Sequence, residues 1–479
     1  MPRQAYLGAK IRRLRKTAGH TQAKLAELLG ISPSYLNLIE RNERALTVPL
    51  LLRLAELFKL DLKTFAEDDE GRLVADLKEV FSDALFAGQV VRDSDLRDAL
   101  SSAPEMARAL VELYAAYRKS REDAQTMAAT RSGSEGPFGW ETARAPSDEV
   151  SDAIQRRLDY YAPLEEAAVA LRAEARLDEV RGDPFFRLAK YVEERHSLQV
   201  DVVPADALEG AVRRFLPTRR RLLLSEALPP ASLSFQLAHQ VALVAAGDEL
   251  SLLVAVEPLT TEEARRLYRV ALANYLASAM LMPYERFLDA TADLRCDVEL
   301  LEHRFRVSFE QVCHRLSTLH RPGAEGTPFH MVRIDVAGNI SKRFSGSGIP
   351  FARYSGSCPL WNVHAAFLTP GLIRTQVSEM PDGVRYFSIA RTVRKAGGGH
   401  QVRQSRFAIE LGCAIAHARD IVYADGVDLE AAAVPVGVSC RLCERMDCRQ
   451  RAFPPMHHRL DVDENVRGLS FYYSPRPRS

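Results

Sequence analysis

Three cysteines close together near the end of the chain have the spacing of ligands for a metal ion or an iron–sulfur cluster. Cys440, Cys443 and Cys448 are separated by two and by four residues, in a segment rich in arginine. The short gap lets the first two thiolates reach one metal or cluster, and the longer gap brings the third one round. The neighbouring guanidinium groups favour thiolate over thiol. The spacing is typical of an iron–sulfur cluster, for which we expect the 4Fe–4S type, and is also compatible with structural zinc.

The fourth ligand of this cluster stays open between several residues. Cys413 and Cys358 are the cysteine candidates, and Cys413 is included in the predicted ligand set. His457 or His458 would instead complete a structural zinc site, which is the alternative to a cluster. A position left open to solvent is a further alternative.

A second group of residues, in the first 67 positions, has the pattern of a DNA-binding unit. Gly30 can take the positive φ that ends a helix, Ser32 can cap the next helix, and Pro33 suits its first position. Leu36 and Ile39 would bury that helix. The pattern resembles the helix-turn-helix of the lambda-repressor or XRE type, in which the start of the third helix reaches base edges. The predicted DNA contacts are Gln22, Ser32, Ser34, Tyr35, Asn37, Arg41, Asn42 and Arg44.

Such a unit reads only a short half-site, so these modules usually bind DNA as dimers. Residues 68–146 are charged, alanine-rich and helical in pattern until a linker rich in glycine and serine. We expect this region to connect the domains and to hold two or more copies of the chain together.

Residues 233–243 resemble the active-site helix of the ImmA/IrrE-type metallopeptidases. That helix carries His-Glu-x-x-His, in which two histidines bind zinc and the glutamate acts as a base. Here His239 remains, but Gln240 cannot take up a proton and Leu243 cannot bind a metal. We therefore expect residues 147–290 to form a degenerate, non-catalytic peptidase domain in which His239 is buried and hydrogen-bonded.

A degenerate pocket can still bind a ligand, and two basic groups nearby suit an anionic one. The first group combines aromatic and basic side chains: Phe185, Arg187, Lys190 and Tyr191. The second is a run of arginines: Arg213, Arg214, Arg219, Arg220 and Arg221. Either group can hold phosphates, and a solvated basic face is the alternative for each.

The whole composition is that of a globular protein with several domains. The chain has 479 residues, 47% hydrophobic and 27% charged, and a net charge of +1, so a nucleic-acid surface must be local. We expect a multidomain, mainly α fold with an α+β part over residues 291–479, where runs such as 329–336 and 386–393 have strand character. Polar residues and prolines interrupt the longest uncharged stretches, and no secretory signal is visible. The expectation is a cytoplasmic protein without a membrane span.

Taken together, these features resemble the family of short-chain fatty acyl transcriptional regulators. The resemblance is strongest over residues 308–319, 337–344, 358–361, 423–426 and 440–448. It implies a repressor-like domain joined to a peptidase-like sensor region and a C-terminal domain. It also implies that acyl-CoA modulates binding to double-stranded operator DNA, with an iron–sulfur cluster in at least some members and no catalysis.

Two other functions remain open at this point. One is a redox or iron sensor that regulates transcription without an acyl-CoA ligand. The other is a zinc-dependent peptidase of the anti-repressor type, which the residues at positions 240 and 243 disfavour.

Overall fold

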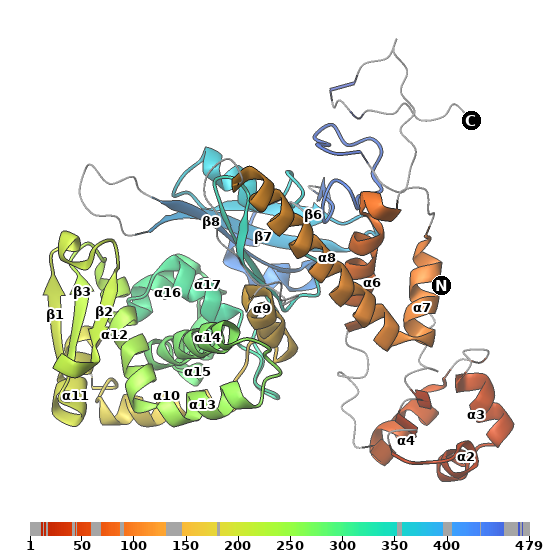
Figure 1. Ribbon diagram of the computed structural model, residues 1–479, viewed down its shortest axis with the longest axis horizontal. Helices are drawn as coiled ribbons and strands as arrows, with labels where there is room; N and C mark the ends of the chain where they lie inside the picture. Colours follow the sequence, from red (N-terminus) through yellow and green to blue (C-terminus); the bar gives the residue numbers. More distant parts are fainter. Residues whose placement is uncertain are drawn as a thin grey trace. The chain divides into compact units, whose positions relative to one another are not determined.

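The computed structural model contains two compact units, which divide after Thr142. Figure 1 shows the helices and strands of each unit. The structure describes residues 11–12, 14–15, 18–40, 44, 46–58, 69–86, 91–130, 146–179, 183–351, 357–395, 405–431, 433–454, 468–469 and 472.

The first unit begins with the helices of the predicted DNA-binding domain. They are α2 (Gln22–Leu29), α3 (Pro33–Glu40) and α4 (Val48–Phe58). Gly30 ends α2 with a φ of 67°, and the Ser32 hydroxyl accepts a hydrogen bond from the Tyr35 amide at 3.1 Å, as predicted. The helices share one small apolar core, formed by Ile11, Leu25, Ala26, Leu29, Leu36, Ile39, Leu50 and Leu54.

A second helical group follows in the same unit. It contains α6 (Asp69–Phe81), the short helix η1 (Ala84–Phe86), α7 (Asp93–Ser102) and α8 (Pro104–Thr130). These helices pack around an apolar cluster of their own: Leu77, Val80, Leu96, Leu100, Ala107, Val111 and Tyr114. The predicted helical character of this region is therefore confirmed over the described residues.

The second unit starts with a helical part that surrounds the long helix α14 (Glu262–Leu281). Helix α14 contacts α9 (Pro146–Arg156), α10 (Ala162–Glu174), α12 (Pro230–Ala245), α13 (Gly247–Ala255) and α17 (Phe309–Leu316). The part also contains α11 (Pro184–His196) and α15 (Tyr284–Asp293). A small sheet in the order β1-β3-β2 accompanies them, made of β1 (Gln199–Val203), β2 (Arg213–Leu216) and β3 (Arg221–Ser225). Strand β3 is parallel to β1 and antiparallel to β2.

The rest of this unit is built on a six-stranded sheet in the order β5-β4-β8-β7-β6-β9. Its strands are β4 (His330–Asp335), β5 (Ile340–Ser345), β6 (Arg374–Glu379), β7 (Arg385–Arg394), β8 (Arg406–Ala414) and β9 (Ala433–Pro435). All pairings are antiparallel except that of β6 with β9. Helices α16 (Val298–Phe305) and α17 (Phe309–Leu316) precede the sheet, and the short α18 (Asn362–Ala365) lies between β5 and β6 in sequence.

One apolar cluster extends through both parts of the second unit. It runs from Val150 in α9 to Ala424 and includes Ile409 and Leu411 of β8. Their neighbour Ala408 belongs to a separate cluster, with Trp361 and Ala390. Because successive side chains of a strand point to opposite faces, the sheet has two buried faces. The boundary expected at residues 290 and 291 falls inside the first cluster and marks no break in the packing.

The structure confirms the predicted fold class, a mainly α chain with a C-terminal sheet. The strand runs expected at 329–336 and 386–393 appear as β4 and β7. Within the described ranges no single helix is long and apolar enough to cross a membrane, although α12 and α13 together meet that criterion with a bend of 77° between them.

Candidate DNA interface, thiol loop and relic metal site

The start of α3 is exposed on the surface of the helix-turn-helix. Ser32 and Ser34 are exposed, while Tyr35 and Asn37 are half-buried. The Gln22 amide donates hydrogen bonds to Asn37 Oδ1 at 3.4 Å and to Glu40 Oε2 at 3.0 Å. These bonds tie the first residue of α2 to α3, so they fix the orientation of the helix that would enter the major groove.

Buried Glu40 is the centre of this connection. The Arg15 guanidinium donates to both oxygens of Glu40, at 2.6 and 3.1 Å, and this partner raises the pKa of Arg15. The predicted contact Arg44 is exposed, and its amide donates to the Leu38 carbonyl at 3.2 Å. Arg41 and Asn42 lie outside the described residues.

The predicted cysteine ligands lie in a loop that we call the thiol loop, residues 436–451. Cys440 and Cys443 are buried and Cys448 is partly exposed. Arg451 holds the loop in shape by donating to the carbonyls of Cys440 at 2.6 Å and Cys443 at 2.9 Å. A Cβ at Gly437 would lie 2.8 Å from the Cys443 sulfur, so this close approach requires glycine.

Hydrogen bonds attach the thiol loop to the end of strand β6. Arg445 donates to the carbonyls of Glu379 at 2.9 Å and Met380 at 3.0 Å. The Trp361 indole donates to the Gly437 carbonyl at 2.9 Å. Because Trp361 follows Cys358 closely in sequence, this bond brings the segment that carries Cys358 to the loop.

Cys358 is the cysteine outside the loop that lies beside its thiols. Its amide donates to the Val438 carbonyl at 3.1 Å. Burial raises the pKa of the Cys358 thiol to about 11, and the nearby Cys440 and Cys443 thiols act in the same direction. The sequence identified Cys358 as a candidate without placing it in the predicted ligand set.

Cys413, the fourth ligand in the predicted set, lies elsewhere. It is fully buried in β8, opposite Phe387 of β7, and belongs to the large apolar cluster with Cys296. Burial raises the pKa of its thiol to about 12, with smaller effects from Cys296 and Asp420. The structure therefore does not bring Cys413 to the thiol loop, because the strand directs its side chain toward the helical core. His457 and His458 lie outside the described residues.

The donor atoms of the thiol loop have the chemistry of a cluster site, although they are not drawn together as one. The three thiols of the loop, with that of Cys358 beside them and the guanidinium groups of Arg445 and Arg451, suit an anionic iron–sulfur cluster. Over the described part of the chain, however, no three histidine, cysteine or acidic side chains are grouped as a metal site.

On α12, the residues that align with the zinc-binding pattern are His239, Gln240 and Leu243, and we call them the relic metal site. Other protein groups surround them. His239 is only 3% exposed, and its Nδ1 lies 2.5 Å from Nη1 of Arg213 on β2. The ring also bonds to the backbone of Val270 on α14, and burial and Arg213 together lower the pKa of His239 to about 3. Gln240 is buried and Leu243 packs against the core. His239 is thus buried and hydrogen-bonded, as the sequence predicts.

The predicted ligand group on α11 has acidic partners. Arg187 pairs with Glu179 at 2.5 Å, and Lys190 pairs with Glu194 at 3.6 Å. The Tyr191 hydroxyl donates to Glu174 at 3.0 Å, while Phe185 packs against the large apolar cluster. The structure gives these cations carboxylate partners and does not direct them to a common point.

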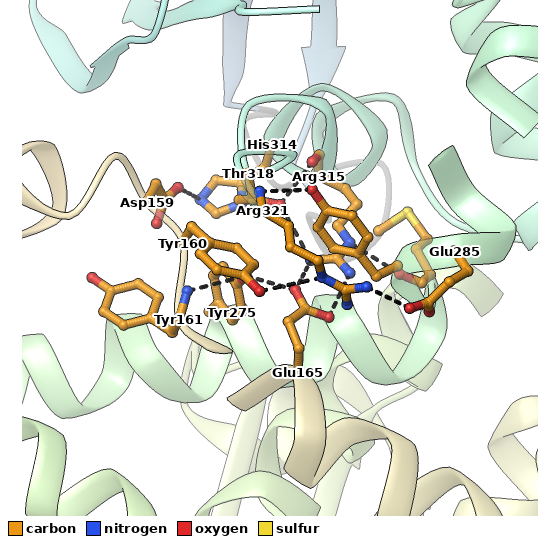
Figure 2. A network of polar contacts seen from close by, with 12 residues as sticks. Asp159, Tyr160, Tyr161, Glu165, Tyr275, Glu285, His314, Arg315, Thr318 and Arg321 are labelled. Carbon is orange, nitrogen blue, oxygen red and sulfur yellow. Dashed lines mark hydrogen bonds and ion pairs between the residues drawn. The ribbon is translucent and has the colours of Figure 1, made fainter. Parts of the chain in front are cut away.

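A polar network that sequence reasoning missed joins α10, α14 and α17 (Figure 2). Arg315 of α17 is fully buried and donates to both carboxylate oxygens of Glu165 on α10. The Tyr275 hydroxyl of α14 donates to the same carboxylate at 2.6 Å. The guanidinium of Arg321 lies 4.0 Å from the centre of the Tyr284 ring. The sequence offered one sign of this network, a single arginine, Arg315, within the helix 309–316. It did not reveal the partner, because Glu165 lies 150 residues away.

Comparison with known protein families gives a match for three parts of the chain. Residues 318–472 match the family model for the C-terminal region of short-chain fatty acyl coenzyme A regulators. Residues 193–317 match the IrrE N-terminal-like domain, and residues 11–65 match a helix-turn-helix.

Similar proteins span nearly the whole chain. A propionyl-CoA carboxylase regulator of Cereibacter sphaeroides is 40% identical, over 98% of this chain and 99% of its own. The HTH-type transcriptional regulators PrpR and RamB of Mycobacterium tuberculosis are 40% and 39% identical, over 99% and 98% of this chain and 97% and 98% of their own. A solved structure of a Mycobacterium tuberculosis transcriptional regulator matches with a TM-score of 0.65 at 42% identity, over 68% of this chain and 99% of its own. The chain therefore belongs to the family of short-chain fatty acyl coenzyme A regulators, which are DNA-binding transcriptional regulators and not enzymes.

Proposed function

We propose that a short-chain acyl-CoA ester changes the affinity of this protein for its operator. Its helix-turn-helix presents the start of α3 to DNA, and its C-terminal region matches a family defined by acyl-CoA regulation. A relative named a propionyl-CoA carboxylase regulator makes propionyl-CoA the first ester to test. The match over residues 318–472 is the observation that carries the proposal.

The physical basis of such regulation is a difference in affinity between two states of the protein. A ligand that prefers one arrangement of the protein shifts the population toward it, and operator affinity changes by the same coupling free energy. The network around Arg315 crosses the junction between the matched regions, because Arg315 donates to Thr318 Oγ1 at 3.2 Å and Arg321 donates to the Tyr160 hydroxyl at 3.3 Å. It therefore offers a rigid connection through which a change in one region can reach the other.

The experiment is a DNA-binding titration with the full chain. Fluorescence anisotropy of a labelled fragment from a promoter next to acyl-CoA metabolic genes gives the affinity with and without propionyl-CoA or acetyl-CoA. Coenzyme A alone and a random duplex of equal length are the controls. The proposal fails if the protein prefers no promoter fragment, or if no ester changes the affinity.

We further propose that the thiol loop holds an iron–sulfur cluster through Cys440, Cys443, Cys448 and Cys358. The cluster would supply a structural and redox-sensitive link between the loop and the segment before α18. Arg451 and Arg445 support this role because they hold the loop backbone in place and offset negative charge. Zinc in the same loop, or iron sensing without an acyl-CoA ligand, are the alternatives. Ultraviolet–visible spectra and the iron content of anaerobically purified protein distinguish cluster from zinc.

We propose that the protein acts as a homodimer held by the group α6–α8. Ala107, Val111 and Tyr114 of α8 are buried, whereas Met106 and Leu113 are 74% and 67% exposed. Ala109 lies between these two on the same face, so the exposed side chains form an apolar stripe at helical spacing. A second copy covering this stripe would supply the two-fold symmetry that a palindromic operator needs.

A further inference from the structure

The relic metal site contains a positive charge that has no negative partner among the described residues. Arg213 is half-buried in β2, and none of the described carboxylates forms an ion pair with it. Its neighbours differ, because Arg214 pairs with Glu209 at 3.1 Å and Arg221 pairs with Asp201 at 2.8 Å. Burying a cation without a counter-charge is costly, so an unpaired one calls for an anion from outside.

The geometry of Arg213 leaves one edge of its guanidinium available. Nη1 lies 2.5 Å from His239 Nδ1 and 3.2 Å from the Gln236 carbonyl, which it donates to. Nε and Nη2 form no hydrogen bond with the described residues, and neither is among the fully buried side-chain atoms that lack a partner. These two nitrogens form the edge of the guanidinium that binds a carboxylate or phosphate through two parallel hydrogen bonds.

His239 and Gln240 favour this use of the site. His239 stays neutral, with Nδ1 as the acceptor from Arg213, because burial and Arg213 lower its pKa to about 3. Gln240 stands where the peptidase helix carries its glutamate, so no carboxylate at this position competes for the guanidinium or repels an anion. A fixed monovalent cation thus lies against the histidine that remains from the zinc-binding pattern.

We propose that Arg213, oriented by His239, binds an oxyanion of a small metabolite, either a phosphate of a coenzyme A ester or a free carboxylate or phosphate. Burial lowers the pKa of Arg213 only to about 10, so the guanidinium stays charged at neutral pH. Binding of a coenzyme A ester at Arg213 rests on the proposed function, whereas binding of a free carboxylate or phosphate does not.

The first test uses the unaltered full chain. An arginine-selective dicarbonyl reagent modifies accessible guanidinium groups, and peptide mass spectrometry gives the rate at Arg213 and at its neighbour Arg214. We expect inorganic phosphate, propionate or propionyl-CoA to slow modification at Arg213 and not at Arg214. Propionyl-CoA acting alone indicates the ester as the source, and the free ions acting alone indicate a small-anion site. Equal rates at Arg213 with and without all three probes overturn the proposal.

The second test uses variants of the same chain. Binding of the protecting probe is measured by calorimetry for Arg213→Gln, Arg213→Lys and the matched control Arg214→Gln, each with a circular-dichroism spectrum. We expect Arg213→Gln to weaken binding by about tenfold or more, as for loss of a charge-assisted hydrogen bond, and Arg214→Gln to leave it unchanged. Arg213→Lys keeps the charge without the two-nitrogen edge, so an intermediate affinity supports the geometry. Undiminished binding by Arg213→Gln, or equal losses in both glutamine variants, overturns it. If propionyl-CoA still binds undiminished and shifts operator affinity, the inference fails while the proposed function stands.

Discussion

Arg315 and Glu165 form a two-point ion pair across 150 residues of sequence, with nitrogen–oxygen distances of 2.7 and 2.9 Å. The guanidinium also donates to the Met282 carbonyl at 2.9 Å, and the Tyr275 hydroxyl shares the carboxylate. Because Arg315 is fully buried, the pair has no access to water that would replace a lost partner. It fastens the peptidase-like helices to the helix that precedes the large sheet.

Removing the carboxylate of this pair should destabilise the second unit strongly. Glu165→Gln leaves a buried, uncompensated guanidinium, which costs about 3–5 kcal/mol. Urea unfolding followed by the fluorescence of buried Trp361 measures the change. The exposed pair of Arg266 with Glu262 is the control, since Arg266→Ala should cost less than about 1 kcal/mol. Equal effects of the two substitutions would show that the buried pair contributes no more than a surface one.

The thiol loop predicts a difference between two buried cysteines. Cys358→Ser should lower the iron content and the visible absorbance of anaerobically purified protein, because Cys358 lies beside Cys440 and Cys443. Cys413→Ser should keep both, since Cys413 lies in β8 with Cys296 as its neighbour. Iron retained by the first variant and lost by the second would restore Cys413 as the fourth ligand.

The exposed stripe on α8 predicts a dimer that one charge can disrupt. Leu113→Glu should shift the protein from dimer to monomer in light scattering and should weaken operator binding, because a buried carboxylate at the interface is unfavourable. Leu85→Glu, at a 60% exposed position of the same unit, should leave the dimer intact. A Leu113→Glu protein that remains dimeric places the contact between copies elsewhere.

Two residues of the helix-turn-helix should affect DNA binding in different ways. Asn37→Ala should lower specific affinity by about 1–3 kcal/mol and reduce discrimination between operator and random duplex, as for a base contact. Arg44→Gln should weaken both duplexes similarly and reduce the salt dependence by about one counterion, as for a phosphate contact. Anisotropy titrations at several salt concentrations separate the two effects. A salt slope that changes with Asn37 instead of Arg44 would reverse the assignment.

Buried neutral histidines predict that the second unit loses stability in mild acid. Burial lowers the pKa of His330 to about 3, and the pKa of His239 and His314 is lowered to about 3 as well. Below pH ~6.5 the unfolded chain binds protons that the folded chain does not, so stability falls as the pH decreases toward 3. Each such histidine contributes about 1.4 kcal/mol per pH unit within that window.

His330→Gln should therefore make the dependence of the unfolding free energy on pH shallower between pH 6.5 and 5. The slope is the relevant quantity, because the substitution also changes the stability itself. His303→Gln on the exposed surface of α16 is the matched control. An unchanged slope in the His330 variant would mean that His330 takes up its proton without unfolding.

Local features of this protein are predictable from sequence because they depend on neighbouring residues. Ser32 caps α3 and Gly30 ends α2 as expected, since both roles depend on backbone geometry within a few positions. The strands β4 and β7 likewise agree with the strand character of their sequences.

Relations over long distances in the sequence are not predictable in this way. Cys358 and Cys413 look equivalent as ligands, and only the sheet decides between them: β8 directs Cys413 into the helical core, while Cys358 bonds to Val438. Arg213 is one of several clustered arginines, and only the packing of β2 against α12 singles it out. The pairing of Arg315 with Glu165 requires the fold of three helices, for which the sequence holds no local signal.

The apolar cluster that runs from Val150 to Ala424 also limits how this regulator can be recombined with its relatives. A chimera spliced between residues 317 and 318 would inherit the two halves of that interior from different parents, and Arg315 would face a foreign Thr318. Side chains from different parents would leave cavities and steric clashes in this cluster, and substitutions at the surface would not remove them. Exchange between relatives is therefore best made before α9, so that the second unit is transferred whole.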